Sequence, residues 1–431
     1  MIDLFAALVV LGTFILIIRG AEVRLALVAG GAVLAIASGK PGAWFDAFAA
    51  SMVQANLITV ILPALGFAAV VRLSGCDAHL VRLVVARLLK MRGAIVPAAM
   101  LATLLLSIPI TSAAGITAAV GVVLIPAMIA MGVRPAMAGA ALIGGTWGAV
   151  FSPGSPHPAL IADLAKTTVM DVILAHVKAS TPAAVLYAVL IYLVARVLRE
   201  DRGWAPTEPA AKTQPAAPAE DERVNYLRAA MPILPLALLI ITLPQFGLTT
   251  AWLPKGITVL QAMIIGTLVT AVITRLSPTK ASQVFFDGMG EAYGSVIGII
   301  IAAGVFIAGL NTFGSIDRLI ETLKHAQSAA PAAAMLGTFG IAVLSGSGDA
   351  AAIAFNKAML PHAELLGMTK VGLGNIAWIC ASIGRGMSPV AAATAIAAGY
   401  AGVSVFDIAK RTALPAIAAA LLAVLILAMI G

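Results

Sequence analysis

Long apolar stretches separated by short polar loops follow one another along almost the whole chain. Runs such as 1–18, 24–38 and 412–430 are long enough to span, or nearly span, a lipid bilayer. Because lipid offers the backbone no hydrogen-bond partner, segments of this kind must be helical. The alternating pattern of a membrane β-barrel is not seen. The pattern therefore predicts an all-α polytopic membrane protein.

The same landmarks occur twice in this pattern, about half the chain apart. A Ser, a Pro, a Gly, a Ser-Pro pair and an Asp follow one another in each half: Ser112, Pro126, Gly132, Ser152 and Asp171, then Ser347, Pro361, Gly367, Ser388 and Asp407. The offset is 235 residues for the first three pairs and 236 for the others. A long-period duplication with Gly, Ser and Pro breaks is typical of a secondary transporter with two related halves.

Each half is predicted to hold five spans and one re-entrant hairpin. We expect a first repeat at 1–198, a linker at 199–228 and a second repeat at 229–431. An odd number of crossings makes the second repeat inverted relative to the first. In the first half the expected spans are 2–18, 24–38, 53–72 and 181–198, with a hairpin at 93–131 and a broken span at 135–176. In the second half they are 230–246, 256–275, 292–310 and 412–430, with a hairpin at 330–361 and a broken span at 371–401.

The basic residues support this arrangement. Of the 27 Lys and Arg residues, it places eighteen on the side of the linker and seven on the other, with Lys357 and Arg385 inside the second half. Basic loops mark the cytoplasmic side. We therefore expect a cytoplasmic linker, both termini outside, and hairpins that open to opposite sides of a bacterial inner membrane.

Composition narrows the class further. The chain is 61% hydrophobic and 11% charged, with a net charge of +8. Because the charges sit in short loops, they indicate topology and not nucleic-acid binding. Arg19 and Arg24 follow the first span without a small-residue cleavage site, which predicts a retained helix. The two cysteines, one in each half, indicate no disulfide framework. Segments 79–90 and 316–326 alternate apolar and charged residues, as interfacial helices or charged loops do.

The hairpin tips at 110–115 and 345–350 and the breaks at 151–158 and 384–389 are rich in Gly, Ser and Pro. Backbone groups freed there must line a protein-enclosed or watered cavity, and half-helix N-termini direct N–H groups toward an anion. The alternative is four Pro-kinked spans that serve packing. We expect substrate contacts from Thr111, Ser112, Gly115, Ser152, Gly154, Ser155, Ser347, Gly348 and Ser388.

Charged residues inside the apolar segments are few. Arg385 lies in the second break, where its planar fork suits a carboxylate, either of the substrate or of Asp349 at the second tip. Both are therefore candidate binding residues. His157 in the first break is either a proton relay or a hydrogen-bonded structural histidine. Ser112 and Ser347, with freed carbonyls, are candidates for a Na⁺ site, and Asp349 and His157 are the candidates for H⁺.

No catalytic motif of the HExxH, Walker A or GxSxG type is present, and Cys and His do not cluster. The sequence therefore predicts a protein that is not an enzyme and has no cofactor beyond a coupling Na⁺ or H⁺. A membrane-embedded enzyme or scaffold is the alternative from a different class.

The motifs "GSGDAAAIAF", "IGRGMSPVAAATAIAAG" and "VSVFDIAKRTALP" of the second half resemble the DcuC-type anaerobic C4-dicarboxylate carriers of the ion transporter superfamily. "TSAAGITAAVGVVLIPA" of the first half resembles them more weakly. Asp349 stands where that family more often has Asn, and the first break, with three prolines and His157, departs from the family's Ser-Gly-Asp type.

The resemblance implies a homodimer in which each protomer has a scaffold domain and an elevator-like transport domain. The implied substrates are succinate, fumarate and malate, moved by exchange, efflux or cation-coupled uptake. Two other readings are open. One is a permease for another organic anion, such as a monocarboxylate or gluconate. The other is a cation/proton antiporter with Asp349 as the titrating group, which Arg385 disfavours.

Overall fold

The structure, a computed structural model, describes residues 2–19, 21–88, 90–204, 224–243, 256–316 and 329–430. Every regular element in these ranges is helical, as the sequence predicts. Within the described ranges, five helical segments are long and apolar enough to cross a membrane: Ala55–Ser74, Ala113–Ala130, Val169–Val197, Pro278–Thr312 and Val405–Met429. Most of the expected linker (205–223), the end of the span expected at 230–246 and nearly all of segment 316–326 lie outside the described residues.

The first half begins with α1 (Ile2–Ile18), α2 (Val23–Ala37), α3 (Ala43–Met52), α4 (Ala55–Ser74) and α5 (Cys76–Leu88). The expected hairpin is α6 (Ile95–Leu106) and α7 (Ala113–Ala130). The broken span consists of α8 (Pro135–Gly145), a 3-10 turn (Thr146–Phe151) and α9 (Pro156–Ala165), and α10 (Val169–Val197) closes the half. Segment 79–90 is helical through Leu88, within α5.

The last two elements of this half have different limits from those expected. Thr168 and Asp171 form a capping box that begins α10 at Val169. Pro182 then lies inside this 29-residue helix. The expected boundary between 176 and 181 is therefore not present. The helix begins at Val169, seven residues before position 176, and continues through Pro182 to Val197.

The second half contains α11 (Tyr226–Ala230), α12 (Leu234–Ile241), α13 (Val259–Thr274), α14 (Pro278–Ala292) and α15 (Gly298–Thr312). A π-helical turn (Tyr293–Ile297) joins α14 to α15, so a helical rod replaces the shorter span expected at 292–310. The second hairpin is α17 (Ala330–Ser345) and α18 (Gly348–Met359). After a 3-10 segment (Leu360–Leu366) come α19 (Lys370–Arg385) and α20 (Ala392–Ala401), which form the second broken span, and α21 (Val405–Ile430).

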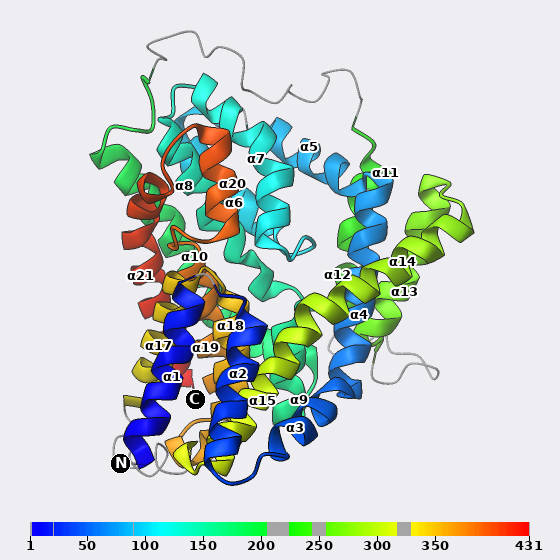
Figure 1. Cartoon of the computed structure of the whole chain (residues 1–431). Helices are drawn as coiled ribbons and strands as arrows, with labels where there is room; N and C mark the ends of the chain where they lie inside the picture. Colours follow the sequence, from blue (N-terminus) through cyan, green and yellow to red (C-terminus); the bar gives the residue numbers. More distant parts are fainter. Residues whose placement is uncertain are drawn as a thin grey trace.

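Helices at equivalent positions of the two halves pack reciprocally. α2 packs on α15 and α13 on α4, while α3 packs on α15 and α14 on α4. α10 packs along α21, its counterpart. Glycines permit the closest of these approaches: a methyl group on Gly31 would lie 2.5 Å from the carbonyl oxygen of Val305, and one on Gly309 would meet the carbonyl oxygen of Gly31. Figure 1 shows α6 and α7 in the upper part of the molecule and α17 and α18 in the lower part.

The buried apolar residues fall into two regions. The largest core is built mainly from α5–α8, α10 and α17–α21, which we call the hairpin bundle. Two smaller cores come mainly from α1, α2, α4, α12, α13 and α15; together with α3 and α14 these helices form the outer frame. α9 lies between the two, since Ala159 and Leu160 join a frame core while Ile161 and Ala162 join the core of the hairpin bundle.

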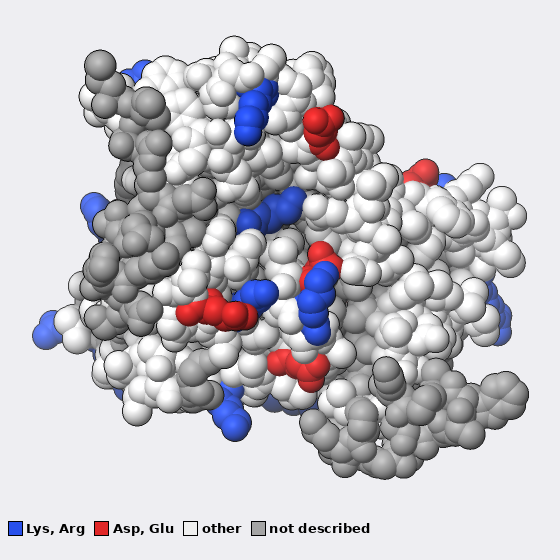
Figure 2. Space-filling view, turned by 90° about the horizontal axis from the view of Figure 1, so that it is seen from below, with Lys and Arg blue, Asp and Glu red and all other residues white. Residues whose placement is uncertain are grey.

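The surface of the long helices suits lipid. Large apolar side chains are exposed along α1 and α21, among them Leu4, Leu8, Leu421 and Leu425. Figure 2 views the molecule from below, toward the lower ends of these helices, and shows positive and negative side chains near the middle of that face and at its rim. Exposed apolar area of this extent is expected where hydrocarbon replaces water as the solvent.

Candidate functional site

The two hairpin tips have the same local structure. Ser112 caps α7, and its hydroxyl accepts a hydrogen bond from the N–H of Gly115 at 3.1 Å. Ser347 caps α18 and accepts from the N–H of Ala350 at 3.2 Å. Serine is a preferred residue at this position because its oxygen satisfies an N–H of the first helical turn. Each tip therefore presents a helix N-terminus, where the backbone favours negative charge.

The two breaks also match. The hydroxyl of Ser152 accepts from the N–H of Gly154, and that of Ser388 accepts from the N–H of Val390, both at 3.3 Å. Both serines are buried. Ser155, also buried, precedes α9. Each hydroxyl accepts a hydrogen bond from a backbone N–H that has no helical partner, and so stabilises non-helical backbone in the protein interior.

Each tip meets the break of its own half. A small cavity of about 30 Å³ is lined by Thr111 of the first tip and by Ser152 and Gly154 of the first break, with Phe67 and Met263 of the outer frame. In the second half, a methyl group on Gly346 would lie 2.9 Å from the backbone of Ala391, and one on Gly348 would lie 2.7 Å from the carbonyl oxygen of Ala381.

The two tips are not joined directly by their serines. Ser112 is exposed, and the hydrogen bonds of Ser112 and Ser347 with other described residues stay within their own tips and caps. Gly115 uses its N–H in the cap of α7. Convergence of these groups on one cavity therefore stays a prediction.

A charged cluster links the two halves. Asp349 of the second tip places Oδ1 3.0 Å from Nε2 of His157 in the first break. The same oxygen lies 3.7 Å from Nη1 of Arg385, so the expected contact between Asp349 and Arg385 is present. The contact with His157 was not foreseen, because 192 residues separate the pair and no local pattern signals it.

Arg385 leaves one side of its guanidinium unpaired. Its side chain is 10% exposed, and its Nε and Nη2 have no hydrogen-bond partner within the described part of the chain. Nε–H and one Nη2–H point in the same direction, which is the geometry that receives a carboxylate through two parallel hydrogen bonds. Nδ1 of His157 also has no partner there, and its ring stacks on Trp378 with centroids 3.6 Å apart.

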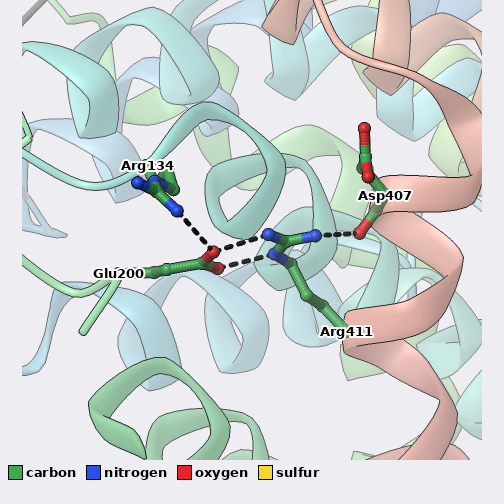
Figure 3. Close-up of polar contacts among 4 residues, drawn as sticks. All are labelled: Arg134, Glu200, Asp407 and Arg411. Atoms are coloured by element: carbon green, nitrogen blue, oxygen red, sulfur yellow. Dashed lines mark hydrogen bonds and ion pairs between the residues drawn. The ribbon is translucent and has the colours of Figure 1, made fainter. Parts of the chain in front are cut away.

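A second arginine is fully engaged by contrast (Figure 3). Nε and Nη2 of Arg411 donate to the two carboxylate oxygens of Glu200 at 2.6 and 2.5 Å, and Nη1 donates to the backbone oxygen of Asp407. Nη1 of Arg134 lies 3.5 Å from the same carboxylate, whose side chain is 3% exposed. This cluster ties α8 and the segment after α10 to α21. No sequence pattern indicated this cluster, because Glu200 falls in the expected linker.

A larger cavity of about 900 Å³ lies between α4, α9, the start of α10 and α13. Polar residues contribute to its wall: Asn56, Thr59, Asp163, Thr167, Thr168 and Asp171. The helix ends that line it lie in the lower part of the molecule, away from the traces that lead into residues 205–223 (Figure 1). A solute-sized opening therefore separates the outer frame from the hairpin bundle on this side.

The described residues form an all-helical protein with paired hairpins and paired breaks, an arrangement that is typical of secondary transporters. Residues 45–431 match the DcuC family, described as C4-dicarboxylate anaerobic carrier. Because this match covers most of the chain, the protein belongs to that family. It is thus a membrane transporter and not an enzyme, as the sequence analysis predicted.

Individual relatives agree with this assignment. A Haemophilus influenzae protein described as an uncharacterized transporter is 40% identical over 266 residues, which is 61% of this chain and 95% of that protein. The "Probable anaerobic C4-dicarboxylate transporter DcuC" of Vibrio cholerae is 26% identical, over 74% of this chain and 69% of that protein. The "Anaerobic C4-dicarboxylate transporter DcuC" of Escherichia coli K12 is 30% identical over 38% of this chain and 37% of that protein.

The fold is similar to that of a solved transporter. The crystal structure of the YdaH transporter from Alcanivorax borkumensis, described as having an unusual topology, aligns with a TM-score of 0.58. The alignment covers 90% of this chain and 86% of that one at 18% sequence identity. At this identity the likeness concerns the fold alone.

Proposed function

We propose that the protein is a secondary active transporter of small organic anions, and that its substrates are C4-dicarboxylates such as succinate, fumarate and malate. The observation that carries the proposal is the buried edge of Arg385, which has no partner among the described residues and lies beside the N-terminus of α18, where the backbone favours negative charge. The names of the Vibrio and Escherichia relatives support the choice of dicarboxylates.

In this proposal Arg385 binds one substrate carboxylate through Nε and Nη2. Asp349 holds the opposite side of the guanidinium and orients it. The remaining contacts come from hydroxyl and backbone N–H groups of both tips and both breaks: Thr111, Ser112, Gly115, Ser152, Gly154, Ser155, Ser347, Gly348 and Ser388. The hydrogen bonds of the tip serines do not join the two halves. In this proposal a bound substrate contacts both halves and so connects these groups.

We propose two inverted repeats and an elevator motion. Reciprocal packing of α2 on α15 and of α13 on α4 supports the repeat. The division into two apolar regions supports movement of the hairpin bundle, with α9, against the outer frame, which would hold the homodimer together. With the linker in the cytoplasm, the 900 Å³ cavity faces outside, as in an outward-open state.

For coupling we propose Na⁺ bound beside Ser112 and Ser347 with freed carbonyl oxygens, since neutral oxygens suit a hard ion that must also leave. The contact between His157 and Asp349 favours H⁺ as the alternative coupling ion. In that case the proton would reside on this pair.

A monocarboxylate is the second candidate substrate. The observation that favours it is Asp349, whose negative charge lies 3.7 Å from the cation that binds the substrate. Because Arg385 already faces the carboxylate of Asp349, it attracts a substrate with two negative charges less strongly than it would if Asn stood at position 349. A cation/proton antiporter fits less well, because Arg385 repels a second cation.

Uptake of radiolabelled succinate, fumarate, malate, lactate and gluconate into proteoliposomes tests the proposal. We expect saturable uptake of the dicarboxylates that depends on an imposed Na⁺ gradient. If uptake is unchanged when K⁺ replaces Na⁺ but is lost when the pH gradient is removed, the coupling ion is H⁺ and its proposed site is the pair of His157 and Asp349. Uptake of lactate or gluconate without any dicarboxylate would reject the proposed substrate class.

A further inference from the structure

The helix that carries Arg385 has a second polar feature. Asn375, Trp378, Ser382 and Arg385 are spaced by three, four and three residues along α19, which places them on one face of the helix. We call this face the α19 polar stripe. All four residues are buried, and each keeps a polar atom with no partner among the described residues: Oδ1 of Asn375, Nε1 of Trp378, Oγ of Ser382 and two nitrogens of Arg385.

The stripe faces the other functional elements. Trp378 stacks on His157 of α9, and Arg385 contacts Asp349 of α18. Nδ2 of Asn375 donates to the carbonyl oxygen of Val172 in the first turn of α10 at 3.1 Å. α9, α10 and α18 all pack against α19. At 1.5 Å of rise per residue, the stripe is about 15 Å long.

Asn356 of α18 adds to this row. It is fully buried, and both atoms of its amide are without a partner among the residues that the structure describes. Gly348 packs against Ala381 and Arg385, and α18 and α19 run in opposite directions. Eight residues further along α18, about 12 Å of rise, Asn356 reaches the level of the outer part of the stripe.

So many unpaired polar atoms in one row need a common explanation. Roughly 90% or more of buried polar groups in folded proteins have a hydrogen-bond partner, and ordered water supplies it where protein does not. The opposite face of α19, with Ile376, Ile379, Cys380 and Ile383, is apolar and equally buried. The unpaired atoms are thus confined to the face that leads to the charged cluster.

We propose that the α19 polar stripe is a hydrated path along which water and protons reach the fully buried ring of His157 from the outer end of α19. Asn375 forms the outer end of this path, because it binds the first turn of α10, and Thr168 and Asp171 at that turn line the 900 Å³ cavity. The role of the path in coupling rests on the proposed transport function; its hydration does not.

His157, the proton acceptor at the end of the stripe next to Arg385, faces two charged groups, Asp349 and Arg385. The other acidic, basic and histidine side chains on α9 itself and on the elements that pack against it make no ion pair with His157 among the described residues: Arg72, Asp163, Asp171, His176, Lys178, Arg196, Lys357, His362, Glu364 and Lys370. A proton that arrives along the stripe would therefore enter the pair of His157 and Asp349.

Thiol reactivity tests the hydration directly, in full-length protein. Ser382→Cys is placed in a Cys76→Ala/Cys380→Ala background, exposed to Ag⁺ for graded times, denatured, and titrated for remaining thiol with a maleimide. The matched control is the Cys76→Ala protein, whose native Cys380 is also fully buried but lies on the apolar face of the same helix.

We expect the thiol of Ser382→Cys to react at least about ten-fold faster than Cys380, since the reactive thiolate forms where water reaches the sulfur. Adding Asn375→Leu should slow the reaction, because it closes the outer end of the path. If Ser382→Cys does not fold, Asn375→Cys takes its place. Equal rates for the stripe thiol and Cys380 in folded protein would overturn the proposal.

The labelling needs no substrate, so it separates the two proposals. If the protein transports no organic anion but its stripe thiol reacts fast, the proposed function is rejected and the hydrated path is supported. If the protein transports dicarboxylates but its stripe thiol reacts as slowly as Cys380, the proposed function is supported and the hydrated path is rejected.

Discussion

The carboxylate of Asp349 lies 3.7 Å from Nη1 of Arg385, and the Nε–Nη2 edge of the guanidinium has no hydrogen-bond partner in the part of the chain that the structure describes. The sequence left two roles open for Arg385, a partner for a protein carboxylate or for a substrate carboxylate. In this geometry the two roles do not exclude each other. Asp349 contacts one side of the cation, and the other side keeps the two-pronged geometry that a carboxylate requires.

Asp349→Asn should strengthen anion binding. The change removes a negative charge beside Arg385 while nearly preserving the shape of the side chain. Because the Asp349 side chain is 48% exposed, solvent screens part of the effect. We expect the KM for succinate uptake to fall several-fold. An unchanged or higher KM in folded protein would mean that Asp349 does not oppose substrate binding.

Glu200→Gln should destabilise the fold. It weakens two partly buried hydrogen bonds to Arg411 and leaves that cation, whose side chain is 15% exposed, without its counter-charge. Losing one partner of a fully buried pair costs about 3–5 kcal/mol; because Arg411 is partly exposed and the amide of Gln remains, we expect a loss at or below the lower end of this range. Thermal unfolding in detergent measures it.

The matched control for this prediction is Glu22→Gln. Glu22 also pairs with an arginine, Arg24, but both side chains are about half exposed. An exposed pair contributes at most about 1 kcal/mol. Equal unfolding temperatures for the two variants would contradict a structural role for the cluster around Glu200.

The recurring landmarks made much of the fold predictable. The match of Ser112 to Ser347 located both hairpin tips, and the match of Ser152 to Ser388 located both breaks, because the turns there depend on residues three or fewer positions apart; that the tip serines cap α7 and α18 came from the structure. The limits of α10 were not predicted: the expected boundary between 176 and 181 lies inside this helix, which begins at Val169 behind the Thr168 cap.

Contacts between distant segments were not predictable in the same way. His157 binds Asp349, and Glu200 binds Arg411, across 192 and 211 residues. No periodicity connects such pairs; they form because helices of both halves pack in the same bundle. The row of unpaired polar atoms on α19 was equally hidden, because a sequence shows polar residues but not whether their atoms find partners.

Gly31→Ala should loosen the contact between α2 and α15. The added methyl group would lie 2.5 Å from the carbonyl oxygen of Val305, in backbone that cannot move without separating the helices. We expect a loss of about 1–3 kcal/mol, as for other overpacked sites. The control is Gly12→Ala, with open space around the new methyl group. Unfolding temperatures that fall equally in both variants would contradict close packing at Gly31.

The binding of a substrate carboxylate by Arg385 is the central claim, and succinate uptake by two variants in proteoliposomes tests it most directly. Arg385→Lys keeps the charge but loses the two-pronged geometry, so uptake should fall by about 100-fold or more, the equivalent of roughly 2.7 kcal/mol. Asp349→Asn/Arg385→Gln removes both charges, so it should fold without an unpaired buried ion yet fail to transport. Uptake by this double variant at a rate near that of the unmodified protein would contradict the claim.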